Sequence, residues 1–161
     1  MAPRVRVGDR PGMDAHDPCA WALTLSGPPS DGSGRVALAG ATERVAADHL
    51  ARVHGLVTVA RNLRVSVDDL RGELDVVATD SGSGLLVVCE VKARTRAPRG
   101  RGLRPEAVEA LGARQRARIR RMTAVLLADG TLTARSVRFD LVTVDLVADG
   151  AARCRHLAAA W

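Results

Sequence analysis

The chain has 161 residues, a length that suits one domain built around one hydrophobic core. Apolar residues make up 47% of it and aromatic residues only 2%, so Val, Leu and Ala must build that core. The formal charge of +6 favours an anionic partner, nucleic acid first, over a merely charged surface. No apolar run approaches the ~20 residues of a membrane span, and three widely spaced cysteines favour reduced thiols and a cytoplasmic location.

The first 36 residues differ in composition from the rest of the chain. They hold five of the seven prolines, and their formal charge is zero, so all of the net charge belongs to residues 37–161. This composition predicts a flexible extension over residues 1–36, with at most a short local element near Trp21. We expect the folded domain over residues 37–161.

Hydrophobic periodicity in residues 37–161 predicts the order α-β-β-β-α-β. The first helix is expected over 42–54, with Val45, Ala46, Leu50 and Val53 on its apolar face. The remaining elements are strands over 56–64, 73–79 and 85–92, a helix over 105–128, a strand over 136–147 and a short strand near 153–157. The fold class is therefore α/β, a mixed sheet flanked by helices.

The strand predicted over 85–92 has two apolar faces, which is typical of a central strand. Glu90 and Lys92 interrupt one of these faces near the end of the strand, and Lys92 is the only lysine among 24 basic residues. If residues 73–92 form a hairpin, Asp75 on the neighbouring strand approaches Glu90. Two adjacent carboxylates repel each other unless a proton or cation separates them, and Mg²⁺ prefers such oxygen ligands.

The sequence therefore predicts a catalytic site formed by Asp75, Glu90 and Lys92, in which Lys92 assists an attacking water. The alternative is a structural ion pair of Lys92 with Glu90 or Asp75 at the end of a strand. The acid on the paired strand and the basic segment downstream favour the site.

Ten arginines and two glutamates lie between Arg94 and Arg121. A basic edge beside the carboxylates would hold a phosphate backbone without reading its sequence. The predicted nucleic-acid-binding residues are Arg94, Arg96, Arg99, Arg101, Arg114, Gln115, Arg118 and Arg121. The alternative is a solvated helix exterior, on which long arginine stems cover apolar surface.

Two further sets of polar residues have weaker functional signals. Arg138 and Asp140 share one face of the strand predicted over 136–147, which indicates a structural pair. The four histidines show no metal-ligand spacing, so we expect no zinc site.

The chain also resembles the YraN family of small bacterial proteins over roughly residues 38–161. The matching segments are Gly40 to Glu43, Arg61-Asn62 to Arg64, Gly72 to Asp75, Cys89 to Lys92 with Arg94, Gly102, Arg114-Gln115, Arg138 to Asp140 and His156 to Trp161. The resemblance implies a restriction-endonuclease-like fold of the PD-(D/E)XK nuclease superfamily, similar to archaeal Holliday-junction resolvases. It departs from that superfamily's motif at Leu74, where a proline commonly precedes the first acid.

The same resemblance implies roles for individual residues. Asp75 and Glu90 correspond to the two acids of the motif and Lys92 to its lysine, while Glu43 corresponds to an additional acidic ligand of Mg²⁺ or Mn²⁺. Because we expect Glu43 in the first turn of its helix, a favourable interaction with the helix dipole explains it equally well. Resolvase-like relatives often act as dimers, which suggests a homodimer.

The leading hypothesis from the sequence is a metal-dependent endonuclease that hydrolyses phosphodiester bonds of DNA, including branched or structured DNA. The second is a nucleic-acid-binding protein that keeps the nuclease fold without cutting. The third is an interaction protein whose arginine-rich helix binds an acidic partner.

Overall fold

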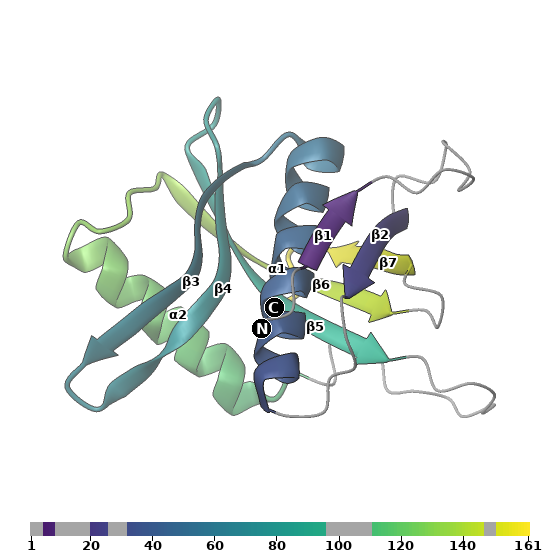
Figure 1. Cartoon of the computed structure of the whole chain (residues 1–161). Helices are drawn as coiled ribbons and strands as arrows, with labels where there is room; N and C mark the ends of the chain where they lie inside the picture. Colours follow the sequence, from purple (N-terminus) through teal and green to yellow (C-terminus); the bar gives the residue numbers. More distant parts are fainter. Residues whose placement is uncertain (1–4, 9–19, 26–31, 96–110, 147–150) are drawn as a thin grey trace.

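The computed structural model describes residues 5–8, 20–25, 32–95, 111–146 and 151–161 (Figure 1). Its elements follow the predicted α-β-β-β-α-β order, preceded by two short strands and followed by the short strand expected near 153–157. In chain order they are β1 (Val5–Gly8), β2 (Ala20–Leu25), α1 (Gly32–His54), β3 (Val57–Val67), β4 (Leu70–Asp80), β5 (Leu85–Thr95), α2 (Ala113–Ala128), β6 (Ser136–Leu146) and β7 (Ala151–Leu157).

The strands of the described segments form one mixed sheet in the order β1-β2-β7-β6-β5-β4-β3. Only β5 and β6 pair in parallel, and α2 provides the crossover that this parallel pairing requires. All other neighbouring strands are antiparallel. The result is an α/β fold consistent with a restriction-endonuclease-like core, as expected.

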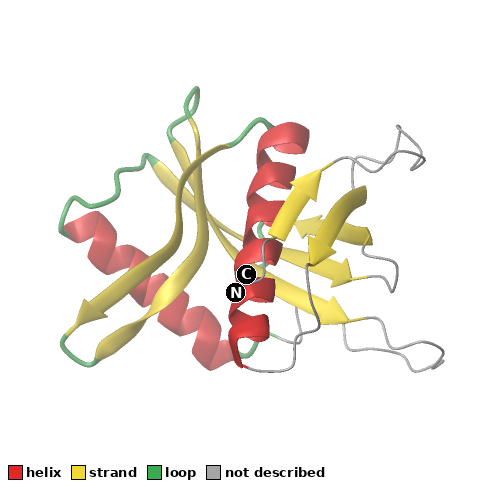
Figure 2. Cartoon of the chain, in the orientation of Figure 1, coloured by secondary structure: helices red, strands yellow, loops and turns green. Residues whose placement is uncertain are grey.

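The two helices cover opposite faces of the sheet (Figure 2). On one face, Val45 and Leu50 of α1 pack on alternate residues of the strands, including Val87 and Val142. On the other face, Ile119 and Met122 of α2 pack on the intervening residues. The central strand β5 is therefore buried on both sides, and aliphatic side chains fill both cores. None of the described helices is both long and apolar enough to cross a bilayer.

The first helix differs from its prediction in length and in one core position. It begins at Gly32, ten residues before the expected start at Thr42. Val45, Ala46 and Leu50 are fully buried as predicted, but Val53, also expected on the apolar face, is 39% exposed. The segment predicted as an extension contains β1 and β2, which join the sheet through β7.

The second helix begins at Ala113, so the prediction of one helix running unbroken from 105 to 128 is wrong at Gly112. This glycine has φ −59° and ψ 154°, an extended conformation, and glycine costs about 1 kcal/mol relative to alanine inside a helix. Residues 105–110 lie outside the described segments. Leu111 and, on α2, Ile119, Met122 and Leu126 are all buried.

The predicted Arg138–Asp140 pair is confirmed, and it forms part of a larger buried cluster. Asp140 is inaccessible to solvent, and Arg138 donates to its two oxygens through Nε and Nη2 at 2.8 Å. His156 Nε2 lies 2.8 Å from Asp140 Oδ2, and the Ala159 amide donates to Oδ1 at 2.9 Å. Asp140 on β6 thereby fixes both β7 and the C-terminal residues. Burial alone would raise the pKa of Asp140, but hydrogen bonds from His156, Arg138 and Ala159 lower it to about 2.

The Asp140→Asn variant tests how much these contacts of Asp140 stabilise the fold. Because the folded-state pKa lies below the ordinary value of 3.8, ionised Asp140 stabilises the fold above pH 4 and loses that effect as the pH falls to about 2. We expect the variant to lose on the order of 2 kcal/mol at pH 7, with a smaller deficit near pH 2. Urea unfolding between pH 2.5 and 7 measures this, with Asp68→Asn in an exposed turn as control. A deficit that does not change with pH would contradict the assignment.

Candidate active site

The candidate site lies where strand β4 leaves strand β5. Their pairing runs from Asp80–Leu85 to Val76–Cys89, while β4 continues to pair with β3 as far as Leu70. In Figure 1 the far end of the β3–β4 hairpin diverges from β5. At this point the amide of Val91 donates to Asp75 Oδ2 at 2.8 Å. A side-chain carboxylate thus satisfies a backbone donor at the place where the two strands separate.

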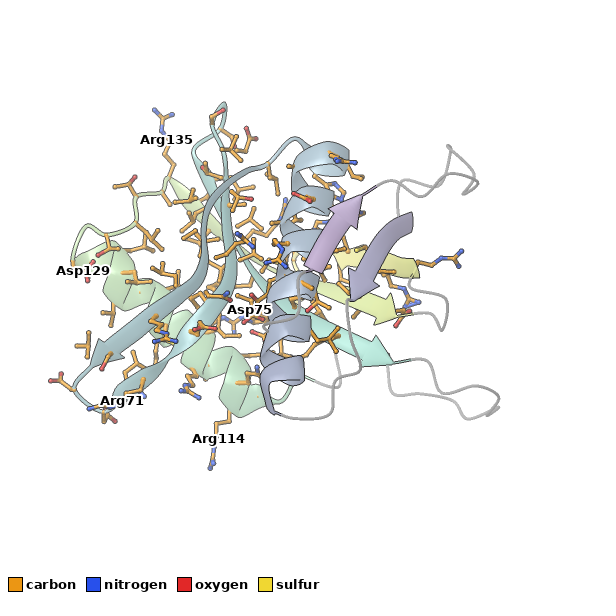
Figure 3. All side chains as sticks on the ribbon, viewed as in Figure 1. Arg71, Asp75, Arg114, Asp129 and Arg135 are labelled. Carbon is orange, nitrogen blue, oxygen red and sulfur yellow. The ribbon has the colours of Figure 1, made fainter. Side chains whose placement is uncertain are left out.

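Asp75 belongs to a group of three carboxylates. Glu43 from α1 and Glu73 from β4 join it, and ligand oxygens of the three residues lie within 4.8 Å of one another. In Figure 3 Asp75 lies between the hairpin and α1, which agrees with this grouping. The group therefore combines acids from a helix and a strand that are separated in sequence by about 30 residues.

Glu43 is the most deeply buried member of this group. It is 8% exposed, and its Oε2 is buried without a hydrogen bond from any described residue. Burial raises the pKa of Glu43, and a side-chain hydrogen bond from Asn62 opposes this rise. Asn62 has φ +53° inside strand β3, a conformation that asparagine tolerates better than most residues. A residue with uncommon backbone geometry thus contacts the site.

Glu90 lies beside this group and has two donors of its own. Lys92 Nζ donates to Glu90 Oε1 at 2.8 Å, and Gln115 Nε2 of helix α2 donates to the same oxygen at 2.6 Å. The structural ion pair that the sequence left open is therefore present. This pair involves only Glu90. Glu73 has an exposed ion pair of its own, with Arg64 Nε at 3.4 Å, and the carboxylates of Glu43, Glu73 and Asp75 remain close together.

The pKa of Asp75 is raised where these carboxylates lie close together. Burial, followed by the nearby charge of Glu90, raises it from 3.8 to about 7, although the hydrogen bond from the Val91 amide opposes the rise. Glu43 raises it further and Lys92 lowers it. Asp75 therefore holds a proton over much of the range below neutral pH, unless another positive charge replaces that proton.

These residues fit a hard divalent cation. All three members of the close group offer carboxylate oxygens, which Mg²⁺ and Mn²⁺ prefer. The buried Glu43 oxygen, which has no donor among the described residues, is the kind of group that a bound cation would satisfy. A cation here would relieve the repulsion that raises the Asp75 pKa.

Comparison with known proteins agrees with the resemblance seen in the sequence. The model of the uncharacterised protein family UPF0102 matches residues 42–144. The chain belongs to this family. It is 40% identical over 119 residues to a UPF0102 protein of Frankia casuarinae, covering 74% of this chain and 91% of the relative. A relative from Beutenbergia cavernae is 44% identical over 115 residues, covering 71% and 87%, and one from Symbiobacterium thermophilum is 41% identical over 123 residues, covering 76% and 92%.

UPF0102 is the YraN family, so the family resemblance is confirmed, and the relatives are bacterial. Asp75, Glu90, Lys92 and Glu43, the predicted site residues, all fall within the matched segment. The structure brings all four to one region through the contacts described above.

The position of Glu43 corrects one prediction. Because α1 begins at Gly32, Glu43 lies about three turns inside the helix rather than in its first turn. The helix dipole acts mainly on the terminal turns, so it does not explain a buried glutamate at this position. The ligand role of Glu43 stays a prediction.

Two residues of this UPF0102 site were missed in the sequence. Glu73 shares the strand face of Asp75 at a spacing of two residues, a signal that was visible in the sequence. Asn62 hydrogen-bonds to Glu43 and has a positive φ, and no sequence pattern predicts either feature.

The predicted nucleic-acid-binding residues are only partly described. Arg94 is half-buried on β5, while Arg114, Arg118 and Arg121 are exposed along α2, and Gln115 faces Glu90. The other three, Arg96, Arg99 and Arg101, lie outside the described residues.

Asp75→Asn tests the carboxylate crowding. The asparagine oxygen still accepts from the Val91 amide, while one ionisable group is removed. Because the folded-state pKa of Asp75 exceeds its unfolded value, the wild type loses stability as the pH rises from about 4 through 7. We expect the wild type, in EDTA, to lose on the order of 2 kcal/mol more than the variant between pH 5 and 8.

Thermal unfolding at a series of pH values measures this difference. Asp68→Asn serves as the control, because Asp68 is exposed in the β3–β4 turn, and its curve should follow that of the wild type. Parallel curves for Asp75→Asn and the wild type would mean that the Asp75 carboxyl is not crowded.

Proposed function

We propose that this protein is a metal-dependent endonuclease that hydrolyses phosphodiester bonds of DNA. The observation that carries the proposal is the convergence of Asp75, Glu90 and Lys92 at the divergence of β4 and β5, with Glu43 and Glu73 completing an acidic group. Such a group of acids and one lysine suits the cleavage of an anionic ester better than a purely structural role.

Asp75, Glu43 and Glu73 would hold Mg²⁺ or Mn²⁺, with Glu90 beside them. When bound, the cation would stabilise negative charge on the phosphate and favour ionisation of a water.

The chain's own residues prepare the reaction in three ways. Lys92, hydrogen-bonded to Glu90, is placed to orient a water and to neutralise charge that develops on the phosphate. Gln115 donates to the same Glu90 oxygen and so fixes that carboxylate from the α2 side. In the hydrolysis a water oxygen bonds to phosphorus while one P–O ester bond breaks, and the departing oxygen takes a proton.

The basic surface supports nucleic acid as the substrate. Arg114, Arg118 and Arg121 are exposed along α2, the helix whose Gln115 contacts Glu90. A surface of this kind binds a phosphate backbone without reading bases. A non-cutting nucleic-acid-binding protein would use the same arginines but would not need the crowded carboxylates.

Cleavage is tested by incubating the wild type, Asp75→Ala and Lys92→Ala with branched, duplex and single-stranded DNA in Mn²⁺. We expect the wild type to cut and each variant to lose at least about 100-fold in rate, the effect of removing one catalytic group. Arg135→Ala, at an edge of the molecule away from Asp75 in Figure 3, should cut like the wild type.

Two other results would be decisive against the proposal. Equal cleavage by the wild type and both site variants would identify a contaminant. Salt-sensitive DNA binding without any cleavage would favour the non-cutting alternative.

Glu73→Gln tests the cation site without relying on catalysis. If Glu73 contributes a ligand oxygen, its loss should raise the Mn²⁺ concentration for half-maximal thermal stabilisation by at least about tenfold. Asp68→Asn again serves as the control. An unchanged Mn²⁺ dependence would remove Glu73 from the proposed ligand set.

A further inference from the structure

A pocket of about 360 Å³ lies between helix α2 and the end of the β3–β4 hairpin that is farther from β5. Four arginines line it, Arg114, Arg118 and Arg121 from the helix and Arg71 from strand β4. In Figure 3 Arg71 lies at the tip of the hairpin and Arg114 at the first turn of α2, on the same side of the molecule. Arg71 was not among the residues predicted to bind nucleic acid, because only the folded hairpin brings it to α2.

The three helix arginines share one face of α2. Their spacing of four and then three residues places them in successive turns, beside the face that packs on the sheet. Arg118 is held closely against the hairpin, because a Cβ atom at Gly72 would lie 3.0 Å from Arg118 Nη2 and 2.7 Å from Met122 Sδ. The absence of a side chain at Gly72 therefore allows α2 to pack against β4 with Arg118 at the contact.

Charge within this arginine pocket is poorly balanced. Its one acidic lining residue is Asp69, whose side chain is 85% exposed and lies 3.7 Å from Arg121. An ion pair so exposed contributes little, and the lining keeps a net charge of +3. Four arginines that line one pocket favour an anion that accepts charge-assisted hydrogen bonds, and phosphate suits guanidinium donors well.

The pocket also lies at a defined distance from the carboxylates. Arg71 precedes Asp75 by four strand residues, or about 13 Å, and Arg118 and Arg121 follow Gln115 by three and six helix residues, or about 5 and 9 Å. At about 3.4 Å of helix axis per nucleotide of one strand, this corresponds to roughly two to four nucleotides. A strand lying across the carboxylates and along α2 would therefore place another of its phosphates at the pocket.

We propose that the arginine pocket binds a backbone phosphate of the nucleic-acid strand, roughly two to four nucleotides from the bond that is cut. This inference rests on the proposed function and narrows its substrate class to strands that continue past the cut bond. The pocket binds phosphate without contacting bases, so it fixes the position of the strand and adds no sequence preference.

Binding is measured first, by fluorescence anisotropy with a labelled 20-nucleotide DNA in EDTA, for the wild type, Arg71→Ala, Arg118→Ala and Arg135→Ala. We expect each pocket variant to bind about tenfold more weakly and to lower the slope of log affinity against log salt by about one. Arg135→Ala removes the same charge at the opposite end of the molecule and should bind like the wild type. Pocket variants with wild-type affinity and salt slope would overturn the inference.

Cleavage is measured second, on the same DNA and on bis(p-nitrophenyl) phosphate, a small diester with no second phosphate. We expect Arg71→Ala to lose kcat/KM on DNA and to keep it on the small diester, because its carboxylates are intact. Equal losses on both substrates would show that the arginines act on the carboxylate site and would also overturn the inference.

The two experiments separate the inference from the proposed function. Weaker DNA binding by the pocket variants, together with no cleavage by any protein, would support the pocket and refute the endonuclease. Thermal stabilisation by inorganic pyrophosphate that depends on Arg71 and Arg118, with DNA binding unchanged, would identify a free anion as the ligand and refute the strand assignment.

Discussion

The separation of β4 from β5 after the Val76–Cys89 pair is the constraint on which the rest of the site depends. A central strand that loses its neighbour exposes backbone donors in the interior, and burying such a donor without a partner is costly. The Asp75 carboxylate accepts from the Val91 amide and meets this requirement. The same geometry places Asp75 close to Glu90. The two carboxylates repel each other, and this repulsion must be offset by nearby donors or positive charge.

Positive charge and hydrogen-bond donors that offset these acids come from the sheet and from helix α2. Helix α2 supplies Gln115, and β5 supplies Lys92, and both donate to Glu90. Helix α1 instead adds a further acid, Glu43, whose buried oxygen has no donor among the described residues. A fold selected for stability alone would favour apolar residues at these positions, since buried charges are expensive unless fully paired. The gathering of the buried or half-buried acids Glu43, Asp75 and Glu90 at one place therefore points to function.

Different parts of helix α2 have different roles. Its sheet-facing residues build the core, its first turn carries Gln115 to the carboxylates, and its outer edge carries the arginines that meet Arg71 across the pocket. Gly72 allows the close approach of helix and hairpin on which this pocket depends. Acidic and basic regions thus lie side by side, one suited to a cation and the other to phosphate.

The sequence by itself determined the order of elements, the two-sided burial of β5, and the placement of Asp75, Glu90 and Lys92 on neighbouring strands. Those features follow from short-range periodicity, because alternate residues of a strand face the same side. It did not determine the start of α1, the interruption at Gly112, the partnership of Asn62 with Glu43 or the meeting of Arg71 with α2. Only the tertiary structure decided these, because they depend on where strands diverge and how closely a helix packs, which no local pattern encodes.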